Sequence, residues 1–108
     1  MKEIDSIPEE FKNTSTLLVA LGDEHMQRIL LAFESNERLN ILQIAAASTL
    51  SRTAVTHHLK ILHQSGALSS EKVGKEVYFW INHQAIIDAL TGVLDYVKDL
   101  QEQEKEQE

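Results

Sequence analysis

The sequence predicts a mainly α-helical fold with a β-hairpin wing, that is, a winged helix-turn-helix of five helices and two strands. Three observations predict it. A helical pattern over residues 41–47 is joined through residues 48–50 to another over residues 51–64, which is the spacing of a helix-turn-helix. The second of these helices carries polar hydrogen-bond donors along one face. Two β-favouring runs separated by a glycine follow it directly, and a hairpin in that position is a wing.

Length and composition predict one small domain. The chain has 108 residues, of which 43% are hydrophobic and 25% charged, and it contains no cysteine. A core of this size is marginal unless a partner covers more apolar surface. The missing cysteines exclude disulfides, thiolate metal sites and cysteine-based sensing of redox state or arsenite. Residues 1–5 are no secretory signal and no apolar run is long enough to span a membrane, so we expect a cytoplasmic protein without membrane association.

The net charge of −7 argues against a nucleic-acid partner, because phosphate binding normally depends on an excess of lysine and arginine. The distribution of charge weakens this argument. Residues 1–11 and residues 101–108 each contain one lysine and four acidic residues. Residues 40–82 contain four basic and two acidic residues, together with three histidines. The centre of the chain is therefore mildly basic and its two ends are acidic.

The helix predicted over residues 51–64 has marked ends and two contrasting faces. Ser51 is a good N-cap residue and Gly66 a good C-terminal stop. Val55, Leu59 and Leu62 recur at helical spacing and form a single apolar stripe. The opposite face contains no carboxylate, and a DNA major groove would suit it. Its polar side chains are Thr53, His57, Lys60 and Gln64, flanked by Arg52 and Thr56.

The preceding segments predict three helices. The first runs from about residue 7 to residue 21 after a capping box formed by Ser6 and Glu9. The second runs from about residue 24 to residue 34. Asn40 caps the third, over residues 41–47. The strands of the wing are expected at 68–73 and 77–81, with residues 74–76 as the turn.

The last helix is predicted from about residue 83 to residue 101, and its apolar face is wider than one narrow stripe. A domain this small has little core left to cover such a face. We therefore expect a homodimer in which the first and last helices form an isologous interface within a single domain, residues 1–101. Residues 102–108 are expected to be a disordered acidic tail. The predicted interface residues are Phe11, Leu18, Ile87, Leu90, Leu94 and Val97.

Side chains near these elements also have structural explanations. His58 lies at the margin of the apolar stripe and is expected to pack against the domain. His25 and His63 are expected at the surface. Tyr78 and Trp80 are expected to be packing residues of the wing rather than platforms on which bases stack.

The run from Leu50 to Leu62, with Gly66-Ala67-Leu68 and Val77-Tyr78-Phe79, resembles the ArsR/SmtB family of bacterial winged-helix repressors. The resemblance covers roughly residues 18–99. It implies a dimer that binds an inverted repeat over a promoter and releases it on sensing a metal or another signal. It also implies DNA contacts from the wing and from the helix that begins after Ser51. The residues at those positions are Ser51, Arg52, Thr53, Thr56, His57, Lys60, Lys72 and Lys75.

The sequence departs from this family at its metal-binding positions. Metal sensors of the family have a Cys-x-Cys-type pair where this chain has residues 39–43, which include no soft ligand. Zinc-type members have four ligands on the last helix, where this chain has His83, Ala85, Tyr96 and Asp99. Because zinc needs three or four protein ligands, we expect no metal and no cofactor. A non-standard site that includes His83 and Asp99 is left open.

The sequence therefore predicts a dimeric, sequence-specific DNA-binding transcriptional repressor that binds an inverted-repeat operator through helix 51–64 and wing 68–81. The alternative is a winged-helix protein-interaction or dimerisation module without DNA binding, which the charge of −7 favours. We expect no enzyme, since the chain has no glycine-rich phosphate loop and no Ser-His-Asp arrangement. The inducing signal is left open between a small molecule at the dimer interface, an unconventional metal site, a protein antagonist and none at all. Displacement of another repressor is also left open.

Overall fold

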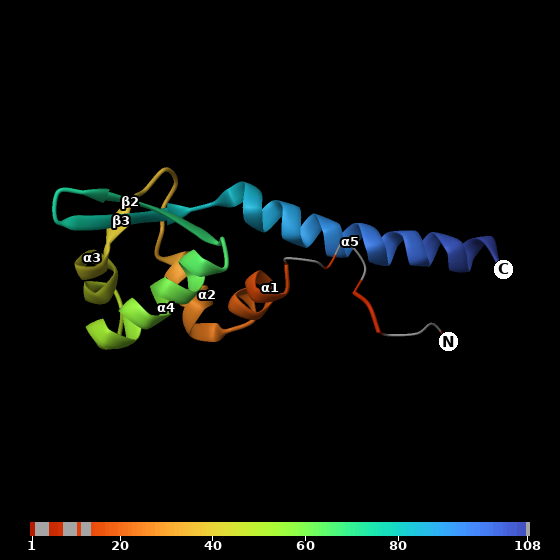
Figure 1. Cartoon of the computed structure of the whole chain (residues 1–108), viewed down its shortest axis with the longest axis horizontal. Helices are drawn as coiled ribbons and strands as arrows, with labels where there is room; N and C mark the ends of the chain where they lie inside the picture. Colours follow the sequence, from red (N-terminus) through yellow and green to blue (C-terminus); the bar gives the residue numbers. More distant parts are fainter. Residues whose placement is uncertain (2–4, 8–10, 12–13, 108) are drawn as a thin grey trace.

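The computed structural model describes residue 1, residues 5–7, residue 11 and residues 14–107. Within them the chain forms five helices and one three-stranded antiparallel sheet (Figure 1). The helices and strands are α1 (Ser15–Leu21), α2 (Glu24–Leu31), β1 (Leu39–Asn40), α3 (Ile41–Ala46), α4 (Arg52–Gln64), β2 (Leu68–Val73), β3 (Glu76–Ile81) and α5 (His83–Glu106).

Helix α4 lies at the centre of the body. Its apolar stripe of Val55, Leu59 and Leu62 is at most 1% exposed. This stripe belongs to one buried cluster that also includes Ile44 of α3 and Leu68 of β2. The predicted amphipathic character of α4 is confirmed, and it leaves the polar face of the helix outside the core.

The predicted starts of three helices are confirmed by their caps. Asn40 and Gln43 form a capping box at the start of α3, with both hydrogen bonds 2.9 Å long. The Ser51 side chain accepts a hydrogen bond from the Ala54 N–H at the start of α4. Asn82 does the same for α5. Each cap satisfies a backbone donor that has no partner inside the helix.

The sheet corrects the prediction of a two-stranded wing. Strand β3 lies between β2 and the short strand β1, and Leu39 of β1 is paired with Phe79 of β3. Two residues are too short to give a strand pattern in a sequence, and β1 pairs only because the fold brings it beside β3. The hairpin turn is also tighter than predicted. Val73 pairs with Glu76, so the loop is Gly74-Lys75, and Gly74 supplies the positive φ of 64° that such turns need.

The boundaries of α1 and α2 differ from those predicted. Helix α1 begins at Ser15, and Ser6 and Ile7 are not helical; Glu9 of the expected capping box lies outside the described residues. Residues 13–16 read Asn-Thr-Ser-Thr, and these side chains favour turns and caps over a helix interior. Helix α2 ends at Leu31 instead of residue 34.

Helix α5 extends further than predicted and leaves the body of the domain. It continues to Glu106, so residues 102–106 are helical, in contrast to the expected disordered tail. The Lys105 side chain contacts Glu102 one turn earlier at 3.5 Å, which is a stabilising spacing on a helix. Figure 1 shows the helix projecting along the long axis of the molecule. No helix within the described residues combines the length and apolarity needed to cross a membrane.

Candidate nucleic-acid interface

The polar face of α4 is exposed along its whole length. Thr53, His57 and Lys60 are exposed on the side opposite the buried stripe, and the flanking residues Arg52 and Thr56 are exposed as well. They come from a helix of 13 residues that contains no Asp or Glu. The structure therefore places these predicted side chains together on one accessible surface, which we call the α4 face.

The first turn of α4 leaves backbone amide groups at this surface. Ser51 Oγ accepts from the Ala54 N–H at 3.1 Å and so fixes the position where the helix begins. The Thr56 hydroxyl donates to the Arg52 carbonyl at 2.8 Å, so its own donor is already satisfied within the helix. The remaining amide groups of the first turn carry a partial positive charge and favour an anion such as a phosphate.

Four basic side chains on α4 and the wing have no carboxylate partner among the described residues. Arg52, Lys60, Lys72 and Lys75 are exposed, and none of them takes part in an ion pair between residues that the structure describes. They remain available to a partner of opposite charge. Lys75 lies in the hairpin turn itself and Lys72 three residues before it, near the tip of the wing.

Arg38 is a functional candidate that the sequence analysis missed. Its guanidinium lies 3.9 Å from the centre of the Trp80 ring and donates to the Glu71 carboxylate at 3.0 Å. The Trp80 ring therefore packs against the Arg38 cation of the same chain, which agrees with its predicted packing role. The contact also pairs one of the two acidic residues of the hairpin with a cation. Arg38 precedes β1, and no sequence pattern indicates a contact across 33 residues.

His63 links α4 to the wing. Its Nε2 lies 3.0 Å from the Ser70 hydroxyl of β2, and its ring meets the edge or face of Phe79 at 6.4 Å between centroids. His63 is exposed, as predicted. Its contacts help to fix the wing relative to the α4 face.

Two further histidines meet where α2 approaches α4. The rings of His25 and His58 stack with 5.6 Å between centroids, and His58 is half-buried, as expected from its position beside the apolar stripe. His58 Nδ1 is buried without a hydrogen-bond partner among the described residues. The Met26 N–H donates to the nearby Asp23 carboxylate, and this hydrogen bond lowers the pKa of Asp23, with smaller contributions from His58 and His25.

The described residues contain no group of three or more His, Cys, Asp or Glu side chains that could hold a metal ion. His83 and Asp99 both lie on α5, sixteen residues apart. At the helical rise this separation is about 24 Å, so the two side chains of one chain cannot share an ion.

Four of the six predicted interface residues lie on α5, between residues 87 and 97. Ile87, Leu90, Leu94 and Val97 are 49–55% exposed, which is high for large apolar side chains. Leu18 on α1 is half-buried. Phe11 contacts its own chain: its ring meets that of Tyr96 on α5 edge-on, at 5.4 Å.

A central helix with an exposed donor face, a short helix before it and a sheet-based hairpin after it define a winged helix-turn-helix protein. A model of the bacterial regulatory protein family arsR matches residues 23–70. These residues run from the cap of α2 into β2. This match and the relatives below support a regulator of the ArsR/SmtB family.

Individual relatives agree with this assignment. The chain is 29% identical over 80 residues to the "Transcriptional repressor SmtB homolog" of Synechocystis, a match that covers 74% of this chain and 60% of the relative. It is 24% identical over 78 residues to the "Transcriptional repressor SdpR" of Bacillus subtilis, covering 72% and 86%. The chain thus spans about three fifths of the length of the Synechocystis protein.

Solved structures share the fold. An ArsR-like transcriptional regulator from Rhodococcus sp. RHA1 superposes with a TM-score of 0.76 at 21% identity, covering 84% of this chain and 85% of the other. The transcriptional repressor PagR of Bacillus anthracis gives a TM-score of 0.60 at 23% identity, with coverages of 74% and 93%. At these identities the likeness concerns the fold.

Proposed function

We propose that this protein is a dimeric, sequence-specific DNA-binding transcriptional repressor that binds an inverted-repeat operator. The observation that carries the proposal is the α4 face, an exposed row of donors without a carboxylate in a chain of net charge −7. Such a helix fits the major groove, where Arg and Lys pair with guanine and Thr contacts bases or the thymine methyl. The names of the Synechocystis and Bacillus relatives, both repressors, support the same function.

The contacts divide into two kinds. Arg52, Thr53 and His57 lie toward the first two turns of α4 and are proposed to face base edges, because the first turns of a recognition helix enter the groove. Ser51 and Lys60 are proposed to bind the phosphate backbone, and Thr56, whose hydroxyl hydrogen is used within the helix, to contact an adjacent base. Lys72 and Lys75 on the wing would reach neighbouring phosphates or the minor groove.

Dimerisation through α5 would place two α4 faces on one duplex. The exposed apolar residues of α5 can cover one another around a twofold axis, as in an isologous interface. Because the twofold axis would relate the two α4 faces, the DNA sequence that they bind would be an inverted repeat. Its half-sites should lie about 34–36 Å apart, or one helical turn, for both copies of α4 to enter successive major grooves.

The charge of −7 favours a second function, a winged-helix module that binds a protein partner and not DNA. The two functions differ in what the α4 face does. Replacement of Arg52 or Thr56 by alanine should weaken the partner complex if DNA is the partner. A protein complex that both variants leave unchanged would favour the second function.

Selection of bound fragments from the organism's own genomic DNA, with and without divalent metals, followed by fluorescence anisotropy over a series of salt concentrations, tests the proposal. We expect saturable binding that weakens steeply with salt. Lys60→Ala should weaken binding and reduce the salt slope by about 1. Lys105→Ala removes the same charge at the far end of α5 and should leave both quantities unchanged. Absence of saturable, salt-sensitive binding at physiological ionic strength would reject DNA binding.

A further inference from the structure

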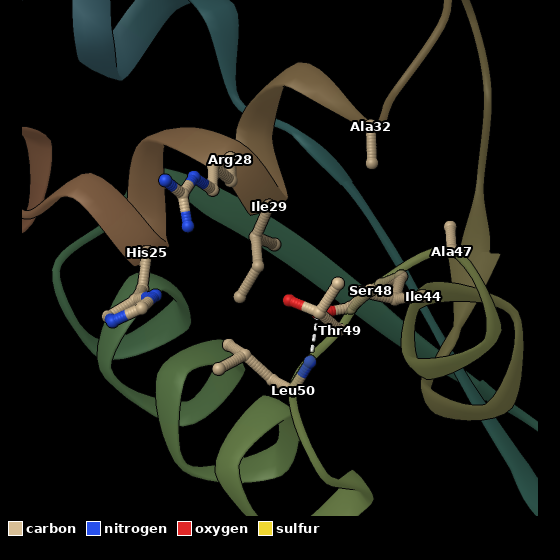
Figure 2. Close-up of a pocket in the computed structure, with 9 residues that line it drawn as sticks. All are labelled: His25, Arg28, Ile29, Ala32, Ile44, Ala47, Ser48, Thr49 and Leu50. Atoms are coloured by element: carbon tan, nitrogen blue, oxygen red, sulfur yellow. Dashed lines mark hydrogen bonds between the residues drawn. The ribbon is translucent and has the colours of Figure 1, made fainter.

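A cavity of about 360 Å³ lies between α2 and the turn that joins α3 to α4 (Figure 2). This volume is within the range of small-molecule sites. Ile29 of α2 points toward Thr49 and Leu50 of the turn, and Ile44 of α3 contributes to the apolar lining. The cavity is thus part of the helix-turn-helix and lies apart from the exposed apolar face of α5.

The charged and polar residues that line this cavity indicate which kind of ligand it can bind. Arg28 and His25 line it together with the hydroxyl of Thr49, and none of its lining residues is acidic. The whole chain has 17 acidic and 10 basic residues, so a lining that has an arginine and no carboxylate stands out. A second cavity of about 300 Å³ differs in that Glu34 and Glu37 line it together with Arg38. The first cavity therefore combines an apolar wall with the Arg28 guanidinium, which suits an anion attached to an apolar body.

Arg28 can bind such an anion although it already has a partner. Its Nη2 donates to the Glu24 carboxylate at 2.5 Å, one turn earlier on α2. Both side chains are more than 60% exposed, and exposed pairs of this kind contribute little stability. The guanidinium has five donor hydrogens, so a ligand carboxylate can be bound beside Glu24 or in its place.

The cavity is connected to the proposed DNA-binding surface at two points. Its lower wall is the turn of residues 48–50, in which Ser48 Oγ accepts from the Leu50 N–H at 2.9 Å directly before α4 begins. His25 stacks on His58 of α4. A ligand that changes the position of either group would change the position of α4.

We propose that this cavity binds a small organic carboxylate, with Arg28 holding the carboxylate and the apolar wall holding the body of the ligand. Binding there alters the affinity of α4 for DNA. This second part rests on the proposed function, because it requires that the α4 face binds DNA. By linkage, DNA must alter the affinity for the carboxylate by the same factor.

Calorimetry with the full chain in the absence of DNA tests the site. The probes are butyrate and benzoate, the uncharged isosteres butyramide and benzamide, and inorganic phosphate. We expect saturable binding of at least one carboxylate and, since a charged hydrogen bond is lost, at least about tenfold weaker binding of its amide. Arg28→Gln should weaken carboxylate binding by a similar factor. Arg38→Gln makes the same change at the second cavity and should have no effect.

A further variant tests the cavity itself. Ala47 lines the cavity from the α3 side, and Ala47→Phe should fill the space and abolish binding. Far-ultraviolet circular dichroism and thermal unfolding of each variant report whether the fold is kept. Equal affinity for amide and carboxylate, an unchanged affinity in Arg28→Gln, or no saturable binding at about 10 mM probe would overturn the proposal. Phosphate binding as tight as that of the carboxylates would overturn the proposal that the ligand is an organic carboxylate.

The regulatory part is measured separately, as the DNA affinity at a saturating carboxylate concentration and at the same concentration of its amide. A change with the carboxylate alone supports the coupling. An unchanged DNA affinity overturns the coupling and leaves the calorimetric result valid. Absence of DNA binding under both conditions overturns the proposed function and the coupling together, whereas the calorimetry still decides whether the site exists.

Discussion

The body around α4 and the projecting helix α5 bury their apolar side chains to very different degrees. Val55, Leu59 and Leu62 on α4 are at most 1% exposed. In α5, all of which is described, Ala89 is the one fully buried residue of 24, and five of its large apolar residues are 42–55% exposed. The body is therefore complete within a single chain, whereas the apolar face of α5 needs another surface to cover it.

The largest expected effect is on the body. Leu62→Ala removes a side chain that is 0% exposed and leaves a cavity in the only buried cluster found among the described residues. We expect a loss of about 2–5 kcal/mol in the free energy of unfolding, measured by urea denaturation at low protein concentration. A loss below about 1 kcal/mol would show that α4 is not the centre of the core.

The same substitution in α5 should act on assembly. Leu94 is 51% exposed, so Leu94→Ala should change the stability of the single chain little. In a twofold interface the substitution occurs twice, and we expect a loss of about 2 kcal/mol of dimer free energy, or roughly thirtyfold in Kd. Sedimentation equilibrium measures it. Leu31→Ala, at an 83% exposed leucine of α2, is the matched control and should leave the dimer unchanged.

A smaller effect is expected where α4 leads into the wing. Gly66 has a φ of +90°, a conformation that side chains with a Cβ rarely adopt. Gly66→Ala should cost about 1 kcal/mol in thermal or urea unfolding and disturb the position of the wing. Gly22 has a φ of −81°, and a Cβ there meets carbonyl oxygens no closer than 3.4 Å. Gly22→Ala should be neutral or slightly stabilising; equal losses in the two variants would contradict this explanation.

The smallest expected effect concerns the cap of α2 and depends on pH. The Met26 N–H holds the pKa of Asp23 below its ordinary value of 3.8. A carboxyl with a lowered folded-state pKa contributes stability that is present above 3.8 and lost as the pH falls through the folded-state pKa. Asp23→Asn keeps a capping oxygen but does not titrate. The difference in melting temperature between the two proteins should therefore change mainly below about pH 4.

Local patterns predicted much of this architecture. The caps Asn40, Ser51 and Asn82 and the apolar stripe of α4 were readable because each depends on residues within a few positions of one another. The sequence predicted the boundaries of α1 and α5 less accurately. The end of a helix depends on small differences in free energy between competing turns and on the segments that pack beside it. A short stretch of sequence predicts neither of these.

The candidate DNA-contacting side chains were predictable for the same reason. The α4 face follows from helical spacing, and the structure places all of its members at the surface. The contact of Arg38 with Trp80 and Glu71 was not predictable, because it joins residues that are up to 42 positions apart. Strand β1 was missed because it is two residues long and is defined by its partner on β3.

The sequence by itself determined which residues form α4, where that helix begins and which of its faces is polar. These features depend on spacing and capping along one continuous segment. Only the tertiary structure decided the third strand, the Arg38 contact and the cavity between α2 and the α3–α4 turn. Each of them is made by segments that are distant along the chain, and their meeting depends on how the whole core packs.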